Sequence, residues 1–167
     1  MQSSAPASQA NDSRQSRLER LARALNFPLD EPVQLGGNYR AAAAHAGIVS
    51  VSGQIPRVGT VVRVTGRTGE QVTLDQAQQG ARICALRILV ILHNQPGSLD
   101  RVAQVLQVGV YTQCTAEFTQ LSEVADAASE VFHQVLGEAG AHARTSVGVY
   151  QLPKNAAVEV NALVAVT

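Results

Sequence analysis

The stretch that decides the fold is GAHARTSVGVYQLPKNAAVEVNALV, residues 140–164. Two runs in it, 145–150 and 158–164, alternate in the manner of strands, and a Leu-Pro-Lys-Asn turn signal separates them. This pattern predicts an antiparallel hairpin. Because successive side chains of a strand point to opposite faces, Arg144 and Glu159 are predicted to share one face.

The valines of the same stretch indicate which face that is. The first strand places Val147 and Val149 on one side, and on the other side Arg144, Ser146 and Gly148. If helices cover the valine side, an arginine and a glutamate stand together on the face that a single subunit leaves open. Two readings follow from the pattern: solvated charges on an outer sheet face, or part of a binding site.

Composition excludes several classes of protein. A chain of 167 residues fits one domain, since domains usually have about 100–200 residues. Its 13 basic and 13 acidic residues cancel, so no long-range field gathers nucleic acid or an anionic membrane. No apolar run reaches the about 18 residues of a membrane span, and the first residues lack the basic start and apolar core of a secretory signal. The sequence predicts a cytoplasmic protein.

Cysteines and histidines give no metal site by their spacing. Cys84 and Cys114 are far apart, with no second thiol or histidine at a short ligand spacing, so two reduced thiols are expected. Cys84 falls in an apolar helical stripe and is predicted to be a core residue. His142 precedes Arg144 by two residues and is predicted to titrate near a bound substrate. No metal and no cofactor is expected.

Hydrophobic periodicity predicts an α+β fold, with a mixed sheet, two long helices on one of its faces and an extra N-terminal helix. That extra helix packs on the outside of the domain or on a neighbouring subunit, or serves as a lid. The expected elements are a polar tail at 1–12, a helix at 14–26 capped by Ser13, strands at 33–35, 39–45 and 48–52, a helix at 74–95 capped by Thr73, a strand at 102–114, a helix at 122–136 and the closing hairpin.

The strand predicted at 102–114 has two different faces. One is apolar and carries Val102, Leu106, Val108 and Val110. The opposite face is small and mixed, with Gln107, Gly109 and Tyr111 among its residues. Such a face is only partly suited to water, and we expect another subunit to cover it.

Two separated motifs resemble the RidA family, also called the YjgF/YER057c/UK114 family. The late motif is carried by Ala143-Arg144-Thr145, Leu152-Pro153-Lys154 and Val158-Glu159-Val160. The early motif is Ser52-Gly53-Gln54-Ile55-Pro56, and Tyr39 stands where the family carries a tyrosine ahead of it. The resemblance covers roughly residues 31–166 and divides the chain into a tail and helix at 1–30 and a RidA-like domain at 31–167.

The resemblance implies a chorismate-mutase-like fold and a homotrimer with pockets between adjacent chains. It also implies hydrolysis of reactive enamines and imines, of the 2-aminoacrylate type, to 2-oxo acids and ammonia. Arg144 then binds the substrate carboxylate and Glu159 accepts a proton, as the catalytic pair. The further residues expected at the substrate are Tyr39, Ser52, Gly53, His142 and Ser146.

Some positions depart from the family pattern and leave alternatives open. His142 replaces the usual proline before Ala-Arg, and Ser146 stands where many members have cysteine. The alternative function is a regulatory protein that binds a small carboxylate without converting it. A third idea, the older label endoribonuclease, gains little support from balanced charge, three tyrosines, three phenylalanines and no tryptophan.

The tail generates a first prediction. Residues 1–12 offer no apolar anchor, so a protein that begins at Ser13 is expected to keep the melting temperature of the full chain within error. Thermal unfolding of the two proteins checks this. A large loss of stability would show that the tail is docked on the domain.

Overall fold

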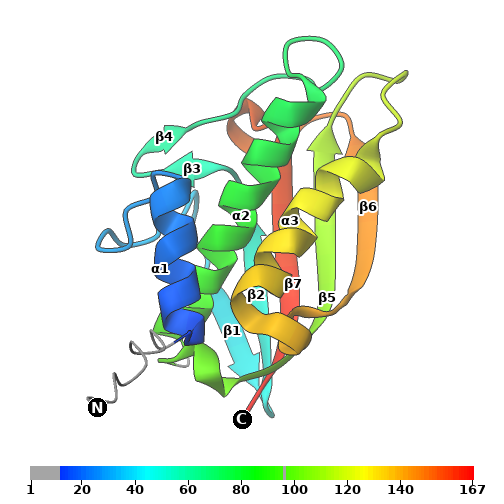
Figure 1. Ribbon diagram of the computed structural model, residues 1–167. Helices are drawn as coiled ribbons and strands as arrows, with labels where there is room; N and C mark the ends of the chain where they lie inside the picture. The colour runs from blue at the N-terminus through cyan, green and yellow to red at the C-terminus, as the bar shows by residue number, and fades with distance from the viewer. Residues whose placement is uncertain (1–11, 96) are drawn as a thin grey trace, which may run out of the picture.

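The apolar stripe of the longest helix organises the structure, a computed structural model that describes residues 12–95 and 97–167. Helix α2 (Leu74–Asn94) buries nearly every side chain between Ile83 and Leu92. Helix α3 (Leu121–Leu136) packs beside it, and both lie across one face of the sheet (Figure 1). The predicted helices at 74–95 and 122–136 are therefore confirmed, and so is the mixed sheet with both on one face.

A capping box fixes the start of α2. The hydroxyl of Thr73 accepts a hydrogen bond from the Gln76 backbone N–H at 3.2 Å, and the Gln76 side chain accepts one from the Thr73 N–H at 2.9 Å. Two N–H groups that the helix itself leaves without partners are thereby satisfied. Thr73 is the cap that the sequence predicts.

The sheet has five strands in the order β1-β2-β7-β5-β6. Strand β5 runs parallel to β6, and every other neighbouring pair is antiparallel. A separate small hairpin joins β3 (Arg57–Val58) to β4 (Val61–Val62). The strands of the large sheet are β1 (Ala42–His45), β2 (Ile48–Gln54), β5 (Val102–Gln113), β6 (Ala143–Val149) and β7 (Val158–Val166).

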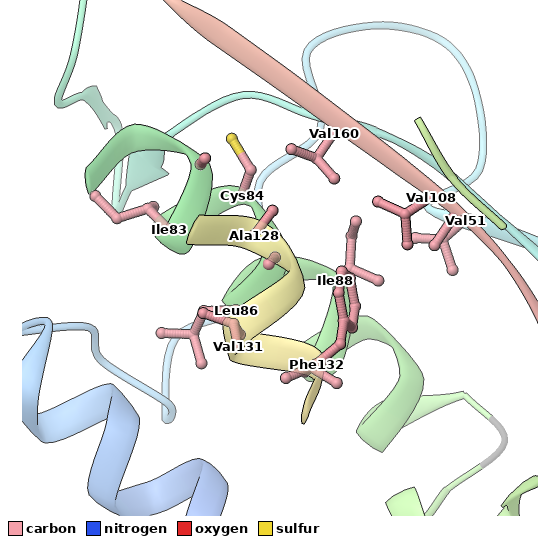
Figure 2. Close-up of a cluster of buried hydrophobic side chains, with 14 of the residues drawn as sticks. Val51, Ile83, Cys84, Leu86, Ile88, Val108, Ala128, Val131, Phe132 and Val160 are labelled. Atoms are coloured by element: carbon pink, nitrogen blue, oxygen red, sulfur yellow. The ribbon is translucent and has the colours of Figure 1, made fainter. Parts of the chain in front are cut away.

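The core lies between the sheet and the two long helices (Figure 2). Valines of the central strands point toward the helices, among them Val51, Val108 and Val160. Ile88 of α2 and Phe132 of α3 meet them and are fully buried. Burying a side chain of this size stabilises a fold by about 1.5–3 kcal/mol, so these contacts fix which face the helices cover.

The predicted hairpin of the closing stretch is wrong. Strand β5 lies between β6 and β7, so the two are not neighbours. The connection between them passes over the end of β5, where the buried side chain of Gln113 holds it. Gln113 accepts a hydrogen bond from the Leu152 N–H at 2.7 Å and donates one to the Asn155 side chain at 2.7 Å. The turn signal is real, but long-range pairing with β5 decides the partner of each strand.

Two smaller predictions about strands also fail. The register of β5 against β7 shifts between Val105 and Gln107, so Val105 is buried and Leu106 is 37% exposed, the reverse of the expected alternation. A bulge of this kind turns the following side chains over. Residues 33–35 form no strand, and β1 begins only at Ala42.

Helix α1 (Arg14–Ala24) packs on the outside of the helix layer and buries Leu18 and Ala22. The Arg14 guanidinium donates to the carbonyl groups of Leu99 and Val102, both at 2.8 Å. The sequence leaves open whether this helix packs on its own domain, packs on a neighbouring subunit or serves as a lid. The structure shows it packed on its own domain. The helix thus lies on the side of α2 and α3 that faces away from the sheet (Figure 1).

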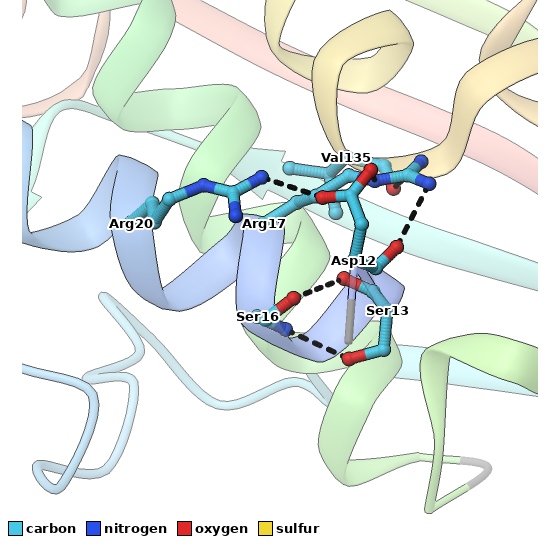
Figure 3. A network of polar contacts seen from close by, with 6 residues as sticks. All are labelled: Asp12, Ser13, Ser16, Arg17, Arg20 and Val135. Carbon is cyan, nitrogen blue, oxygen red and sulfur yellow. Dashed lines mark hydrogen bonds and ion pairs between the residues drawn. The ribbon is translucent and has the colours of Figure 1, made fainter. Parts of the chain in front are cut away.

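Polar contacts hold the first turn of α1 (Figure 3). Ser13 caps it, since its hydroxyl accepts from the Ser16 N–H at 3.1 Å as the sequence predicts. Asp12 pairs with Arg17 at 3.2 Å and with Arg20 at 2.7 Å, and these exposed ion pairs are worth little. Residues 1–11 of the predicted tail lie outside the described residues, so its dispensability stays a prediction.

The capping box leads to a prediction about stability. Thr73→Ala removes the hydroxyl that satisfies the Gln76 N–H, which should cost about 1 kcal/mol and lower Tm by about 2–4 °C. Thermal unfolding measures the difference. Thr119→Ala, at an exposed loop position, is the matched control and should leave Tm unchanged. Equal effects of the two changes would contradict the capping account.

Candidate functional site

The structure brings three of the predicted site residues into one cavity. Tyr39, Gly53 and Glu159 line a pocket of about 140 Å³ near the turn that precedes β7. Arg57 and Arg87 also line it, and sequence reasoning missed both. A signal for Arg87 did exist, because it is a charged residue within the apolar run of α2. A buried charge of this kind is rare unless it has a function or a partner.

Glu159 reaches this pocket from the open face of the sheet. It pairs with Tyr111 across the β7–β5 ladder, while its neighbours Val158 and Val160 point into the core. The carboxyl group lies against Gly53, where an added Cβ would stand 2.8 Å from Glu159 Cδ and closer still to Oε1. Residue 53 therefore has to be glycine for the glutamate to lie here.

Burial raises the pKa of the Glu159 carboxyl above its usual range. Among the residues that the structure describes, none donates a hydrogen bond to this carboxylate. A half-buried carboxylate without a fixed donor can take a proton at higher pH than an exposed one. That is the property of a general base that works near neutral pH.

Arg144 does not share a face with Glu159, which corrects the prediction. In the parallel ladder it pairs with Val108, whose side chain is fully buried under the helices. Its guanidinium Nη1 donates to Asp126 Oδ1 at 2.8 Å and to Ser129 Oγ at 3.0 Å, both on α3. The expectation failed because the valines of β6 do not face the core, and Val147 is 37% exposed on the opposite side.

The same register places two more residues of β6. Ser146 pairs with Val110 and Gly148 with Thr112, so both lie on the helix side with Arg144. An added Cβ at Gly148 would stand 2.8 Å from Cys114 Sγ. Gly148 therefore permits close packing at this edge. It does not lie on the open face of the sheet, where the sequence predicted it.

Ser52 holds the chain that leads to the pocket. Its hydroxyl donates to the Arg40 carbonyl at 2.7 Å, and its N–H donates to the Ala41 carbonyl at 2.9 Å. Tyr39 stands just before this anchored segment and is 48% exposed. Ser52 is thus bound to the backbone that follows Tyr39 and is not among the residues that line the pocket.

His142 takes part in a hydrogen-bonded chain that ends on Arg144. Its Nδ1 lies 2.6 Å from the Gly140 carbonyl, which can only accept, so Nδ1 carries a proton. Its Nε2 lies 2.9 Å from Ser129 Oγ and accepts the hydroxyl proton. Ser129 in turn accepts from Arg144. The chain fixes the orientation of the guanidinium.

Burial lowers the pKa of His142, and the nearby His133 and Arg144 lower it further, against the Gly140 carbonyl, which raises it. The imidazole also stacks on His133, with ring centroids 5.8 Å apart. A lowered pKa favours the neutral imidazole, which agrees with the acceptor role of Nε2 toward Ser129. That His142 contacts a substrate stays a prediction.

Cys84 and Cys114 are free thiols, and burial raises the pKa of both. Cys84 is fully buried, its Sγ lies 3.8 Å from the Val158 carbonyl, and burial raises its pKa strongly, as expected of the predicted core residue. Burial also raises the pKa of Cys114. The two form no disulfide. Within 12–95 and 97–167, no cluster of histidine, cysteine and acidic residues could hold a metal ion, and no helix is long and apolar enough to cross a membrane.

Comparison with known proteins gives one family for most of the chain. The family described as Endoribonuclease L-PSP matches residues 31–166. Protein TCP17 of Trypanosoma cruzi is 41% identical over 128 residues, which are 76% of this chain and 80% of that protein. The match to the family starts after α1. The division at residue 30 stays a prediction.

Solved structures agree with this assignment. Protein Atu1372 from Agrobacterium tumefaciens is 32% identical, with a TM-score of 0.81 over 92% of this chain and 94% of that one. YjgF from E. coli is 21% identical and has a TM-score of 0.57 over 83% of this chain and 95% of its own. The second likeness shows the fold, which is the chorismate-mutase-like fold that the sequence predicts.

The environment of Glu159 predicts how stability varies with pH. Because burial raises its pKa in the folded protein, the native state binds the proton more tightly than the unfolded chain. This tighter proton binding by Glu159 adds to the free energy of unfolding. The addition is fully present below the unfolded pKa of about 4.3 and is lost as pH rises through the folded pKa. Glu159→Gln should therefore gain stability relative to the parent as pH rises.

Chemical unfolding at several pH values from about 4 to 8 measures this difference. Glu117→Gln, at an exposed loop position, is the control and should run parallel to the parent. A Glu159→Gln curve that also runs parallel to the parent would show that the carboxyl titrates as in the unfolded chain.

Proposed function

We propose, from the premise that the chain belongs to the RidA (YjgF) family, that it hydrolyses reactive 2-imino acids and their enamine tautomers to 2-oxo acids and ammonia. The observation that carries the proposal is the half-buried Glu159 carboxylate, held against Gly53 in a pocket that Tyr39 also lines. A small substrate placed there has a proton acceptor beside its reacting carbon. The 2-aminoacrylate type of substrate is the one that the family implies.

Arg144 is the residue that we assign to the substrate carboxylate. Its Nη1 is used by Asp126 and Ser129. The N–H groups on Nε and Nη2 have no acceptor among the described residues, and together they form the edge of a guanidinium that binds a carboxylate with two parallel hydrogen bonds. The contacts of Nη1 thus leave this edge available and hold it in place.

One subunit cannot bring this edge and Glu159 to the same small molecule, because the two residues lie on opposite faces of the sheet. We infer a homotrimer in which Arg144 of one subunit completes the pocket of the next. The open sheet face supports an assembly, since it mixes Tyr111, Val147 and Leu163 with polar residues and none of the described helices covers it.

The reaction follows from these positions. Glu159 accepts a proton from water while the oxygen attacks the imine carbon and the C=N π electrons move to nitrogen. The proton on Glu159 then passes to this nitrogen, which gives the carbinolamine. Glu159 next removes the hydroxyl proton as the C=O bond forms and delivers it to the nitrogen as the C–N bond breaks, so ammonia leaves and the carboxylate is regenerated. Water and imine have then become 2-oxo acid and ammonia. The imine carbon is electrophilic by itself, so the mechanism uses no cofactor.

The prediction for Arg144 is a loss of catalysis without loss of the fold. Arg144→Ala removes two charge-assisted hydrogen bonds worth roughly 1.5–3 kcal/mol, so kcat/KM should fall by about tenfold to a hundredfold. Arg144→Lys should recover only part of the loss, because an ammonium lacks the paired geometry. Ammonia release from imine generated by an amino-acid dehydratase measures the rate.

Arg63→Ala, at an exposed position away from both Arg144 and Glu159, is the control and should keep the parental rate. A parent that never accelerates imine hydrolysis, but still binds small 2-oxo acids, would establish the alternative of a binding or regulatory protein. An Arg144→Ala rate equal to that of the parent would remove Arg144 from the site.

A further inference from the structure

Arg87 is a buried cation with neutral partners. The residue is 3% exposed, in the middle of the apolar stripe of α2. The guanidinium donates to Gln54 Oε1 at 3.1 Å and to the carbonyl groups of Arg57 at 2.9 Å and Gln34 at 2.8 Å. All three acceptors are uncharged. Hydrogen bonds satisfy part of the group, but within the described residues no carboxylate pairs with its charge.

A second cation stands beside the first. Arg57 lines the same pocket, and its Nε is buried with no hydrogen-bond partner among the described residues. Burial is the largest cause that lowers the pKa of Arg87, and the positive charge of Arg57 lowers it further. Two cations at close range in a partly dry site repel each other and are costly unless an anion joins them.

Basic residues outnumber acidic ones in the lining of the pocket. Arg57, Arg87 and Lys154 line it, and Glu159 is the one acidic residue among the lining residues. Its volume of about 140 Å³ is several times what one water molecule requires. A short side chain that ends in an anionic group therefore fits the space and the charge.

We propose that Arg57 and Arg87 bind a second anionic group of the substrate, at the end away from the carboxylate that Arg144 holds. The substrates would then be 2-imino acids whose side chain ends in a carboxylate, and the products 2-oxo dicarboxylic acids. The imine chemistry in this statement rests on the proposed function, whereas the anion subsite rests on the two arginines alone.

A matched pair of ligands tests the subsite without any turnover. 2-Oxoglutarate and 2-oxopentanoate have the same chain length and differ at the last carbon, which is a carboxylate in one and a methyl group in the other. Titration calorimetry of each ligand into the parent should give a Kd at least about tenfold lower for 2-oxoglutarate, the size expected for a charge-assisted contact.

Variants locate the effect. Arg57→Gln removes the charge and keeps a polar side chain of similar length, so the ratio of the two Kd values should fall toward one. Arg63→Gln, at an exposed position nearby in sequence, should keep the parental ratio. Arg87→Lys, which retains the charge with fewer donors, should lie between them, and its unfolding curve shows whether the buried contacts survive.

Two results would overturn the anion subsite. One is a parent that binds both ligands equally or binds neither at millimolar concentration. The other is an Arg57→Gln protein that binds both ligands more weakly to the same extent, which would assign the pair to the 2-oxo carboxylate itself. Absence of imine hydrolysis in the parent, with the ligand preference intact, would instead end the proposed function and leave the subsite standing.

Discussion

The register of β6 on β5 is the constraint on which the rest of the site depends. Parallel pairing sets Arg144 beside Val108, on the side where α3 supplies Asp126. The β5–β7 ladder sets Glu159 beside Tyr111, on the other side. A shift by one residue in either ladder would turn these side chains over. The sheet therefore keeps Arg144 and Glu159 of one chain apart, and the proposed function requires an assembly to bring them to one substrate.

Each of the two groups is prepared by its own surroundings. Glu159 lies in a place that only glycine at position 53 allows, and partial burial keeps its proton affinity high. Arg144 is held by Asp126 and by Ser129, which His142 holds in turn. In the proposed reaction, groups that are fixed before the substrate arrives need little rearrangement, which lowers the barrier.

Local signals in the sequence predict the helices well. Periodicity and caps locate α1, α2 and α3 to within a few residues, because Ser13, Thr73 and Gly137 act through neighbouring backbone groups. The motifs also identify Tyr39, Gly53 and Glu159, which the structure gathers in one pocket. The hairpin prediction fails because strand pairing is decided at long range, here by Gln113 and the end of β5.

The same limit explains the rest of the site. The faces of β6 cannot be assigned from its own alternation when Val147 points away from the core and Arg144 toward α3. Arg57 and Arg87 are distant in sequence and meet only in the folded chain. The most direct measurement mixes Arg144→Ala and Glu159→Gln chains by unfolding and refolding them together. If subunits share each site, the mixture of the two impaired variants should recover about a quarter of the parental activity. An activity in the mixed assemblies no higher than the average of the two variants would contradict the account.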